Sequence, residues 1–150
     1  MLKLSEANIT DQVRGFLEHR GWRAIRLNRS LVQMPFGGAV QFGECGMPDF
    51  QFVRYVGTGR APCLSLTLWV EFKATGIKAR CRCATKKPRQ RCTACDQAKW
   101  RAAERARGGV VWVVDSLGWV EMEYERVFGW LHSGDAGRGQ LMLELAGVGG

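Results

Sequence analysis

One alternating segment constrains the fold of this chain more than any other feature. Between residues 64 and 73, apolar residues occupy every second position: Leu64, Leu66, Leu68, Val70 and Phe72. Successive side chains of a β-strand point to opposite faces, so this segment predicts a strand with one buried apolar face. Glu71 and Lys73 fall together on the other face. A carboxylate and an ammonium group are costly to remove from water, so their presence on a core strand indicates a use for them.

A second acidic residue, Asp49, follows a Gly-Met-Pro tripeptide and begins another strand-like segment. Two carboxylates and a lysine on neighbouring strands are the groups that typically hold a divalent cation and activate water. The expected direct ligands of Mg²⁺ or Mn²⁺ are Asp49 and Glu71, with a main-chain carbonyl near Phe72 as a third. The alternative interpretation is an exposed pair of Glu71 and Lys73 on an edge strand, with Asp49 in a turn.

The remaining elements follow from apolar spacing and from glycine or proline breaks. Ser5 is expected to cap a helix that runs to about His19, and Glu6 to continue its apolar stripe inward. The other expected elements are strands at 22–27, 49–56, 65–73 and 110–114, helices at about 96–107 and 124–131, and a loop or loose hairpin at 28–44. This order predicts an α/β domain at 1–132 with a small mixed central sheet flanked by helices, and a glycine-rich tail at 133–150.

The excess positive charge of the chain, +8 overall, lies in one region. Residues 76–107 contain eleven Lys or Arg and only two acidic residues. Such a run favours a polyanionic partner, nucleic acid first, with a solvated surface as the ordinary alternative. The basic residues expected to contact nucleic acid are Lys78, Arg80, Arg82, Lys86, Lys87, Arg89, Arg91 and Lys99. Arg26, Asn28 and Arg29 are candidates for the same contacts, with a plain surface location at a strand end as the alternative.

An insertion at about residues 76–95 carries two close pairs of cysteines. Cys81 and Cys83 form the first pair, and Cys92 and Cys95 form the second, which has the usual C-x₂-C spacing. Four thiolates can bind one tetrahedral Zn²⁺, and a loop with almost no apolar residues gains stability from such a metal. The sequence therefore predicts a structural zinc site in a zinc-knuckle insertion, with free surface thiols as the alternative.

In the order of its motifs the chain resembles the PD-(D/E)XK nucleases, and most of all their VRR-NUC branch. The resemblance covers about residues 5–131, and the segments that carry it have fitting order and spacing: Ser5-Glu6 with Ile9, Val13, Leu17 and Gly21; Arg26-Leu27-Asn28-Arg29-Ser30; Gly46-Met47-Pro48-Asp49; Glu71-Phe72-Lys73; and Gln97 with Gly108-Gly109 and the valine strand. The basic, cysteine-bearing insertion between Lys73 and Gln97 departs from the family pattern.

The resemblance implies a restriction endonuclease-like core and an enzyme that hydrolyses DNA phosphodiester bonds with Mg²⁺ or Mn²⁺. By this resemblance, Asp49, Glu71 and Lys73 carry catalysis, Glu6 joins or supports the metal site, and Gln97 projects into it from its helix. For Gln97, a hydrogen-bonded buried or capping amide is the alternative. The expected enzyme is an endonuclease selective for branched, flapped or nicked DNA, and a homodimer is plausible because two strands must be cut.

Several other classes of protein are not indicated. The sequence contains no apolar stretch long enough to cross a membrane, no export signal, no glycine-rich phosphate loop and no histidine paired with a carboxylate. We therefore expect a cytoplasmic protein in a reducing compartment, without a membrane partner or a small-molecule cofactor. The competing hypothesis is a non-catalytic DNA- or RNA-binding zinc-knuckle protein on a nuclease-like core.

Overall fold

The computed structural model describes residues 3–27, 31–33, 39–41, 44–57, 64–77, 81, 83 and 92–131. The chain divides into two compact units, Met1–Asp115 and Ser116–Gly150. The first unit contains α1 (Glu6–His19), β1 (Arg23–Arg26), β2 (Leu31–Gln33), β3 (Ala39–Gln41), β4 (Phe50–Val56), β5 (Leu64–Phe72), α2 (Thr93–Ala106) and β6 (Val110–Val114). The second contains α3 (Leu117–Phe128) and the 3₁₀ helix η2 (Gly129–Leu131). The predicted glycine-rich tail lies outside the described residues.

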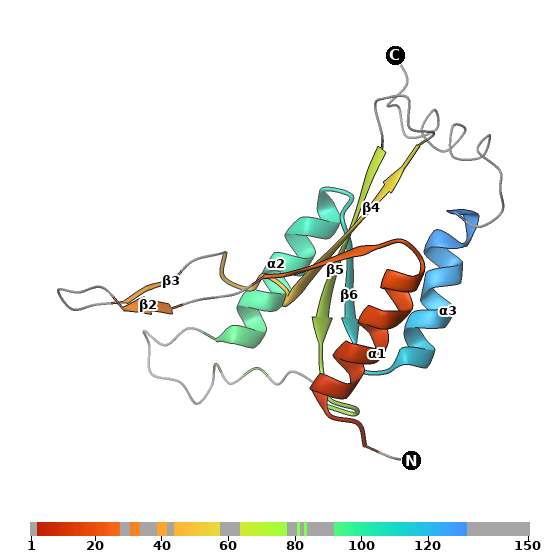
Figure 1. Ribbon diagram of the computed structural model, residues 1–150. Helices are drawn as coiled ribbons and strands as arrows, with labels where there is room; N and C mark the ends of the chain where they lie inside the picture. The colour runs from red at the N-terminus through yellow and green to blue at the C-terminus, as the bar shows by residue number, and fades with distance from the viewer. Residues whose placement is uncertain are drawn as a thin grey trace. The chain divides into compact units, whose positions relative to one another are not determined.

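Four strands of the first unit form one mixed sheet in the order β1-β4-β5-β6 (Figure 1). The β1–β4 and β4–β5 pairs are antiparallel, whereas β5 and β6 are parallel. A separate two-stranded sheet, β2–β3, forms an antiparallel hairpin within the segment where a loose hairpin was one expectation. The predicted α/β class with a small mixed sheet and helices is therefore confirmed. Because β5 has a partner on each side, the alternative that placed Glu71 and Lys73 on an edge strand is excluded.

Helices α1 and α2 lie against opposite faces of this sheet (Figure 1). Phe72 of β5 lines a cavity together with residues of α1, so its face of the sheet is the one that α1 covers. Trp69 has the opposite parity and packs edge to face against Trp100 of α2, with ring centroids 5.1 Å apart. The core on the α1 side is the predicted apolar one, and its fully buried members include Ile9, Val13, Leu17, Phe52, Leu68 and Val70.

The first helix forms where the sequence predicts it. Ser5 has extended backbone angles, and its side chain accepts a hydrogen bond from the main-chain nitrogen of Asn8 at 3.2 Å, which satisfies one donor of the first turn. The helix ends before Gly21, whose φ of +81° favours glycine. Glu6 differs from the expectation: it is exposed instead of buried in the apolar stripe, because a first-turn position lies at the margin of the helix's packed face.

Two helices begin earlier than predicted. α2 starts at Thr93, with Cys92 in the N-cap position, so Cys95 belongs to the helix and not to the insertion. α3 starts at Leu117 because its buried stripe is Val120, Tyr124 and Phe128, which repeats every four residues and extends the helical pattern toward the N-terminus. No helix in the described part of the chain combines the length and the apolar character needed to span a membrane.

Candidate functional site

The carboxylate of Glu71 lies on the face of β5 that α2 covers, and its side chain is fully buried. Charged groups are seldom buried unless they are paired. Arg101 Nη1 donates a hydrogen bond to Oε2 of Glu71 at 2.8 Å, and Lys73 Nζ lies 2.5 Å from Oε1. The lysine contact lacks hydrogen-bond geometry, so Oε1 is buried without a hydrogen-bond donor among the described residues. The pair predicted from the sequence is present, and Arg101 is an additional partner.

Asp49 approaches Glu71 through the register of the sheet. Phe50 of β4 pairs with Val70 of β5, and the main-chain nitrogen of Leu27 donates to the carbonyl of Asp49 at 2.9 Å, which extends the β1–β4 ladder to Asp49. The printed β4–β5 pairing ends at Phe50 with Val70, so Asp49 and Glu71 each lie one residue beyond this last pair. Asp49 itself forms a bend just before β4. The two carboxylates, distant in the sequence, thus come from neighbouring positions at one end of the sheet.

A cavity of about 720 Å³ opens between α1 and this end of the sheet. Its polar lining comes from Glu6, Thr10, Asp11, Arg14, Arg26 and Asp49, and Phe72 contributes to its apolar wall. The structure therefore brings together Glu6, Asp49 and Phe72 from the predicted metal site, and Arg26 from the predicted nucleic-acid contacts. Glu71 and Lys73 are not among the lining residues.

The three acids do not form a compact cluster within the described residues. The only group of three or more Cys, His, Asp or Glu found there with ligand atoms all within 4.8 Å is a set of four cysteines. Glu6, Asp49 and Glu71 are therefore not drawn together as tightly as those thiols. The roles assigned to these acids and to Lys73 stay predictions.

The segment before Asp49 packs on the first turns of α2. Gly46 has a φ of +91°, and a Cβ added to it would lie 2.1 Å from the main-chain oxygen of Asp96. Trp100 Nε1 donates a hydrogen bond to Glu44 at 2.9 Å. Gln97 is buried beside this contact, as its alternative interpretation of a buried amide requires, and its role in the metal site stays a prediction. Only glycine permits this close approach, because it has no side chain. This contact explains why the Gly-Met-Pro-Asp motif has glycine at position 46.

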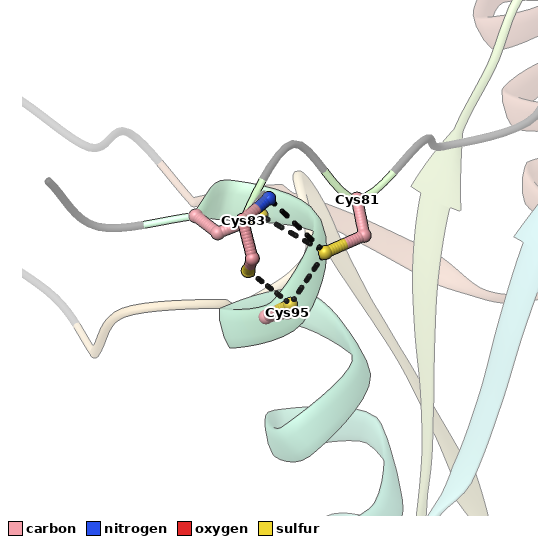
Figure 2. A group of neighbouring side chains, drawn as sticks. Cys81, Cys83 and Cys95 are labelled. Atoms are coloured by element: carbon pink, nitrogen blue, oxygen red, sulfur yellow. Dashed lines mark hydrogen bonds between the residues drawn. The ribbon is translucent and has the colours of Figure 1, made fainter. Parts of the chain in front are cut away.

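Four cysteines meet where the insertion joins α2. The Sγ atom of Cys95 lies 3.4 Å from those of Cys81 and Cys83, and Cys92 Sγ lies 3.9 Å from Cys81 Sγ (Figure 2). A tetrahedral ion with Zn–S bonds near 2.3 Å would place its sulfurs about 3.8 Å apart, close to these separations. Disulfide sulfurs lie only about 2.05 Å apart, so these are free thiols at metal-ligand spacing. The four cysteines could hold a metal ion.

Hydrogen bonds among the thiols polarise the cluster. The Cys83 thiol, with help from the main-chain N–H of Cys83 at 3.4 Å, lowers the pKa of Cys81. The hydrogen bond to Cys81 raises the pKa of Cys83 and is also the main cause that raises the pKa of Cys95. Of Cys81, Cys83 and Cys95, only Cys81 has a lowered pKa, which favours the thiolate form that binds metal.

Most of the predicted nucleic-acid contacts fall outside the described residues, namely Asn28, Arg29, Lys78, Arg80, Arg82, Lys86, Lys87, Arg89 and Arg91. Among the described residues, Lys99 is exposed on α2 and Arg26 is exposed at the cavity. Sequence reasoning missed Arg101 as a partner of Glu71, because that contact joins a helix to a strand across thirty residues. The available signal was its spacing from Gln97, four residues along one helical face.

Comparison of the chain with models of protein families, with curated proteins and with solved structures finds no match. Its function is therefore inferred from its own residues and their geometry.

Proposed function

We propose that this protein is a Mg²⁺- or Mn²⁺-dependent nuclease, built on a restriction endonuclease-like core, that hydrolyses DNA phosphodiester bonds. The observation that supports this proposal is that Asp49 and Glu71 each directly adjoin the last β4–β5 pair, Phe50 with Val70, and that Lys73 is in ion-pair contact with Glu71. Asp49 lines the cavity of about 720 Å³, whereas Glu71 and Lys73 lie outside its lining. In this proposal the cation binds both carboxylates at this end of the sheet and assists hydrolysis of a phosphodiester.

The residues present fit a divalent cation. Oε1 of Glu71 is buried and contacts the ammonium group of Lys73 without hydrogen-bond geometry, so a cation could share this oxygen with the lysine. Asp49 and Glu71 would hold the cation, together with the main-chain carbonyl of Phe72. When bound, the cation would polarise the phosphate and offset the negative charge that develops during hydrolysis.

The side chains around the carboxylates have separate tasks in this proposal. Lys73 orients the attacking water and counters charge on the phosphate, since its ammonium group already lies beside Glu71. Arg26, exposed at the cavity, holds a phosphate of the substrate. Gln97 orients neighbouring groups from α2, and Glu6 supports the metal site from the cavity wall. The bond broken is between phosphorus and the 3′ oxygen, opposite the incoming water.

The cysteine cluster holds a structural Zn²⁺ in this proposal, because four thiols lie at tetrahedral spacing and no carboxylate or histidine accompanies them in the group. The zinc ion would stabilise the basic insertion, and the insertion would bind DNA. It would also select branched, flapped or nicked substrates for endonucleolytic cleavage. A homodimer would present two such sites to two strands. Free thiols persist best in a reducing compartment, so the proposed location is the cytoplasm.

One observation favours a second candidate, a non-catalytic DNA- or RNA-binding zinc-knuckle protein. The carboxylate of Glu71 already has two cationic partners, Lys73 and Arg101, and such a neutralised group needs no metal ion. In this candidate the ion pairs stabilise the sheet–helix interface, and the basic insertion alone binds nucleic acid.

Cleavage assays distinguish the two candidates. Plasmid, single-stranded and branched DNA are incubated with Mg²⁺ or Mn²⁺ and with the wild type, Asp49→Asn, Glu71→Gln or the matched control Glu121→Gln, an exposed acid of α3. We expect metal-dependent cleavage by the wild type and the control, and a loss of at least about 100-fold in the two site variants. Equal cleavage by the wild type and Asp49→Asn would overturn the catalytic assignment. Tight DNA binding without cleavage by any form would favour the second candidate.

A further inference from the structure

We infer that the metal ion of the cysteine cluster sets the positions of both proposed catalytic carboxylates, and that helix α2 transmits its effect. The inference rests on the proposed function only in calling Asp49 and Glu71 catalytic. The coupling itself follows from contacts that run from the cysteines through α2 to each of these residues. A zinc ion that serves only to fold the insertion would make no such connection.

The cluster fixes the start of α2. Cys92 is the N-cap residue of this helix and makes no side-chain capping bond, and its Sγ lies 3.9 Å from that of Cys81. Cys95 lies in the first turn, while Cys81 and Cys83 come from the segment that follows β5 (Figure 2). A tetrahedral ion would therefore tie the chain leaving the central strand to the first turn of the helix. The N-terminal end of α2 would lose this tie when the ion is removed.

The first connection leads along α2 to Glu71. Arg101 follows Cys95 by six residues, which is about 9 Å along a helix. Its guanidinium donates to Oε2 of Glu71 at 2.8 Å and is only 18% exposed at the side chain, so the contact depends on the seating of the helix on the sheet. A shift of the helix by a fraction of a turn would break this bond and change the charge around the carboxylate.

The second connection leads from the first turns of α2 to Asp49. The backbone of Gly46 is so close to the carbonyl of Asp96 that a methyl group could not fit between them. Trp100 also holds Glu44 by a hydrogen bond. Asp49 follows Gly46 by three residues, and Pro48 between them is fully buried. Movement of the cysteine-bound turn must therefore move the segment that delivers Asp49.

A pair of tryptophans provides a direct spectroscopic measure of how α2 packs on the sheet. The rings of Trp69 on β5 and Trp100 on α2 are 5.1 Å apart at an angle of 75°, a geometry that gives exciton-coupled circular dichroism. The Trp69→Phe variant identifies the signal, since the exchange removes one member of the pair. Trp130→Phe is the matched control, because Trp130 lies in the second unit and donates to Val127 instead.

The test compares the wild type with Cys83→Ser and Cys95→Ser, using Cys45→Ser as a thiol control outside the cluster. Zinc content, the tryptophan couplet and DNA cleavage are measured for each. We expect about one zinc ion in the wild type and in Cys45→Ser. The two cluster variants should lose the ion, most of the couplet, and cleavage by about 10- to 100-fold, the usual cost of losing outer support of a metal site. The inference would be overturned if variants without zinc kept both the tryptophan couplet intensity and the cleavage rate within about twofold of the wild type.

If the serine variants do not fold, hydrogen exchange of the wild type decides the matter. After removal of zinc by a chelator, the amides of α2 should lose protection at least about tenfold more than those of α1. Equal losses in both helices, or a wild type that binds no zinc, would contradict the inference. Asp49→Asn separates the two proposals, since it should abolish cleavage but keep both zinc and couplet. A wild type that cleaves no DNA but loses its couplet with zinc would refute the nuclease and leave the coupling intact.

Discussion

Arg101 of α2 donates a hydrogen bond to Glu71 of β5 at 2.8 Å, although thirty residues separate them in the sequence. Lys73 contacts the other oxygen of the same carboxylate. Glu71 is fully buried, so these two cations replace the water that an exposed carboxylate would bind. The same contact joins the helix that contains Cys95, with Cys92 at its N-cap, to the strand that ends in the Glu-Phe-Lys motif.

Removal of Arg101 should destabilise the fold strongly. Arg101→Met leaves the buried carboxylate of Glu71 with Lys73 alone, and breaking one partner of a buried pair costs roughly 3–5 kcal/mol of unfolding free energy. Urea unfolding measures this loss. The double variant Glu71→Gln, Arg101→Met should lose less than the sum of the single losses, because the unpaired charge is removed with its partner. The control is Arg107→Met, because the Arg107 side chain is 70% exposed and its pair with Glu104 should contribute less than about 1 kcal/mol. Equal effects at Arg101 and Arg107 would contradict this prediction.

Gly46→Ala should be costly for two independent reasons. The added methyl group would lie 2.1 Å from the carbonyl oxygen of Asp96, and the φ of +91° is unfavourable for alanine. We expect a loss of more than about 2 kcal/mol, measured by urea unfolding. Gly15→Ala is the matched control, because it lies exposed within α1 with nothing within 4 Å of the new methyl group. It should stabilise the protein by up to about 1 kcal/mol. A neutral Gly46→Ala exchange would show that the segment does not pack on α2 as described.

Acid should release the metal of the cysteine cluster. Zinc binds thiolates, so protons compete with it, and affinity falls as the pH drops. The hydrogen bonds with Cys83 lower the pKa of Cys81, which favours its thiolate form. A chromogenic zinc indicator should report retention near neutral pH and release on acidification, with Cys81→Ser releasing zinc at a higher pH than the wild type. Identical release profiles for the two proteins would argue against Cys81 as a ligand.

A second pH-dependent contact lies in α3. Arg126 donates to Glu123, with Nε at 2.9 Å from Oε2, and this hydrogen bond lowers the pKa of Glu123. The folded state therefore gains stability from the pair above the ordinary glutamate pKa, and loses it as the pH falls through the lowered value. Arg126→Ala should raise the pKa of Glu123, which carbon-detected NMR titration of the carboxylate measures. An unchanged pKa would mean that the pair does not form in solution.

The central strand was predictable because its alternating pattern leaves one register that buries Leu68, Val70 and Phe72. The starts of α2 and α3 were not, since cysteines and a glycine obscure the helical period there. The contact of Arg101 with Glu71 depends on how a helix seats on a sheet, which local spacing does not determine. The apolar spacing of α1 predicted that Glu6 would be buried. Glu6 is exposed because it is the first residue of the helix, at the edge of the packed helix face.

The four cysteines illustrate what spacing alone can give. The two close pairs predicted a common site, and the structure places their sulfurs within 4.8 Å of one another. Their connection to Glu71 and Asp49 became visible only from contacts that residues of α2 make across long stretches of sequence: Trp100 with Glu44, Arg101 with Glu71 and Asp96 with Gly46.

The most direct test of the proposed metal site is a crystal structure of the wild type soaked with Mn²⁺, with data collected for anomalous scattering. The account predicts an anomalous peak that touches carboxylate oxygens of both Asp49 and Glu71 at roughly 2.0–2.6 Å, the range for hard cations with oxygen ligands. Carboxylates that point into different surroundings, with no peak between them and with Glu71 still bound by Lys73 and Arg101, would contradict it.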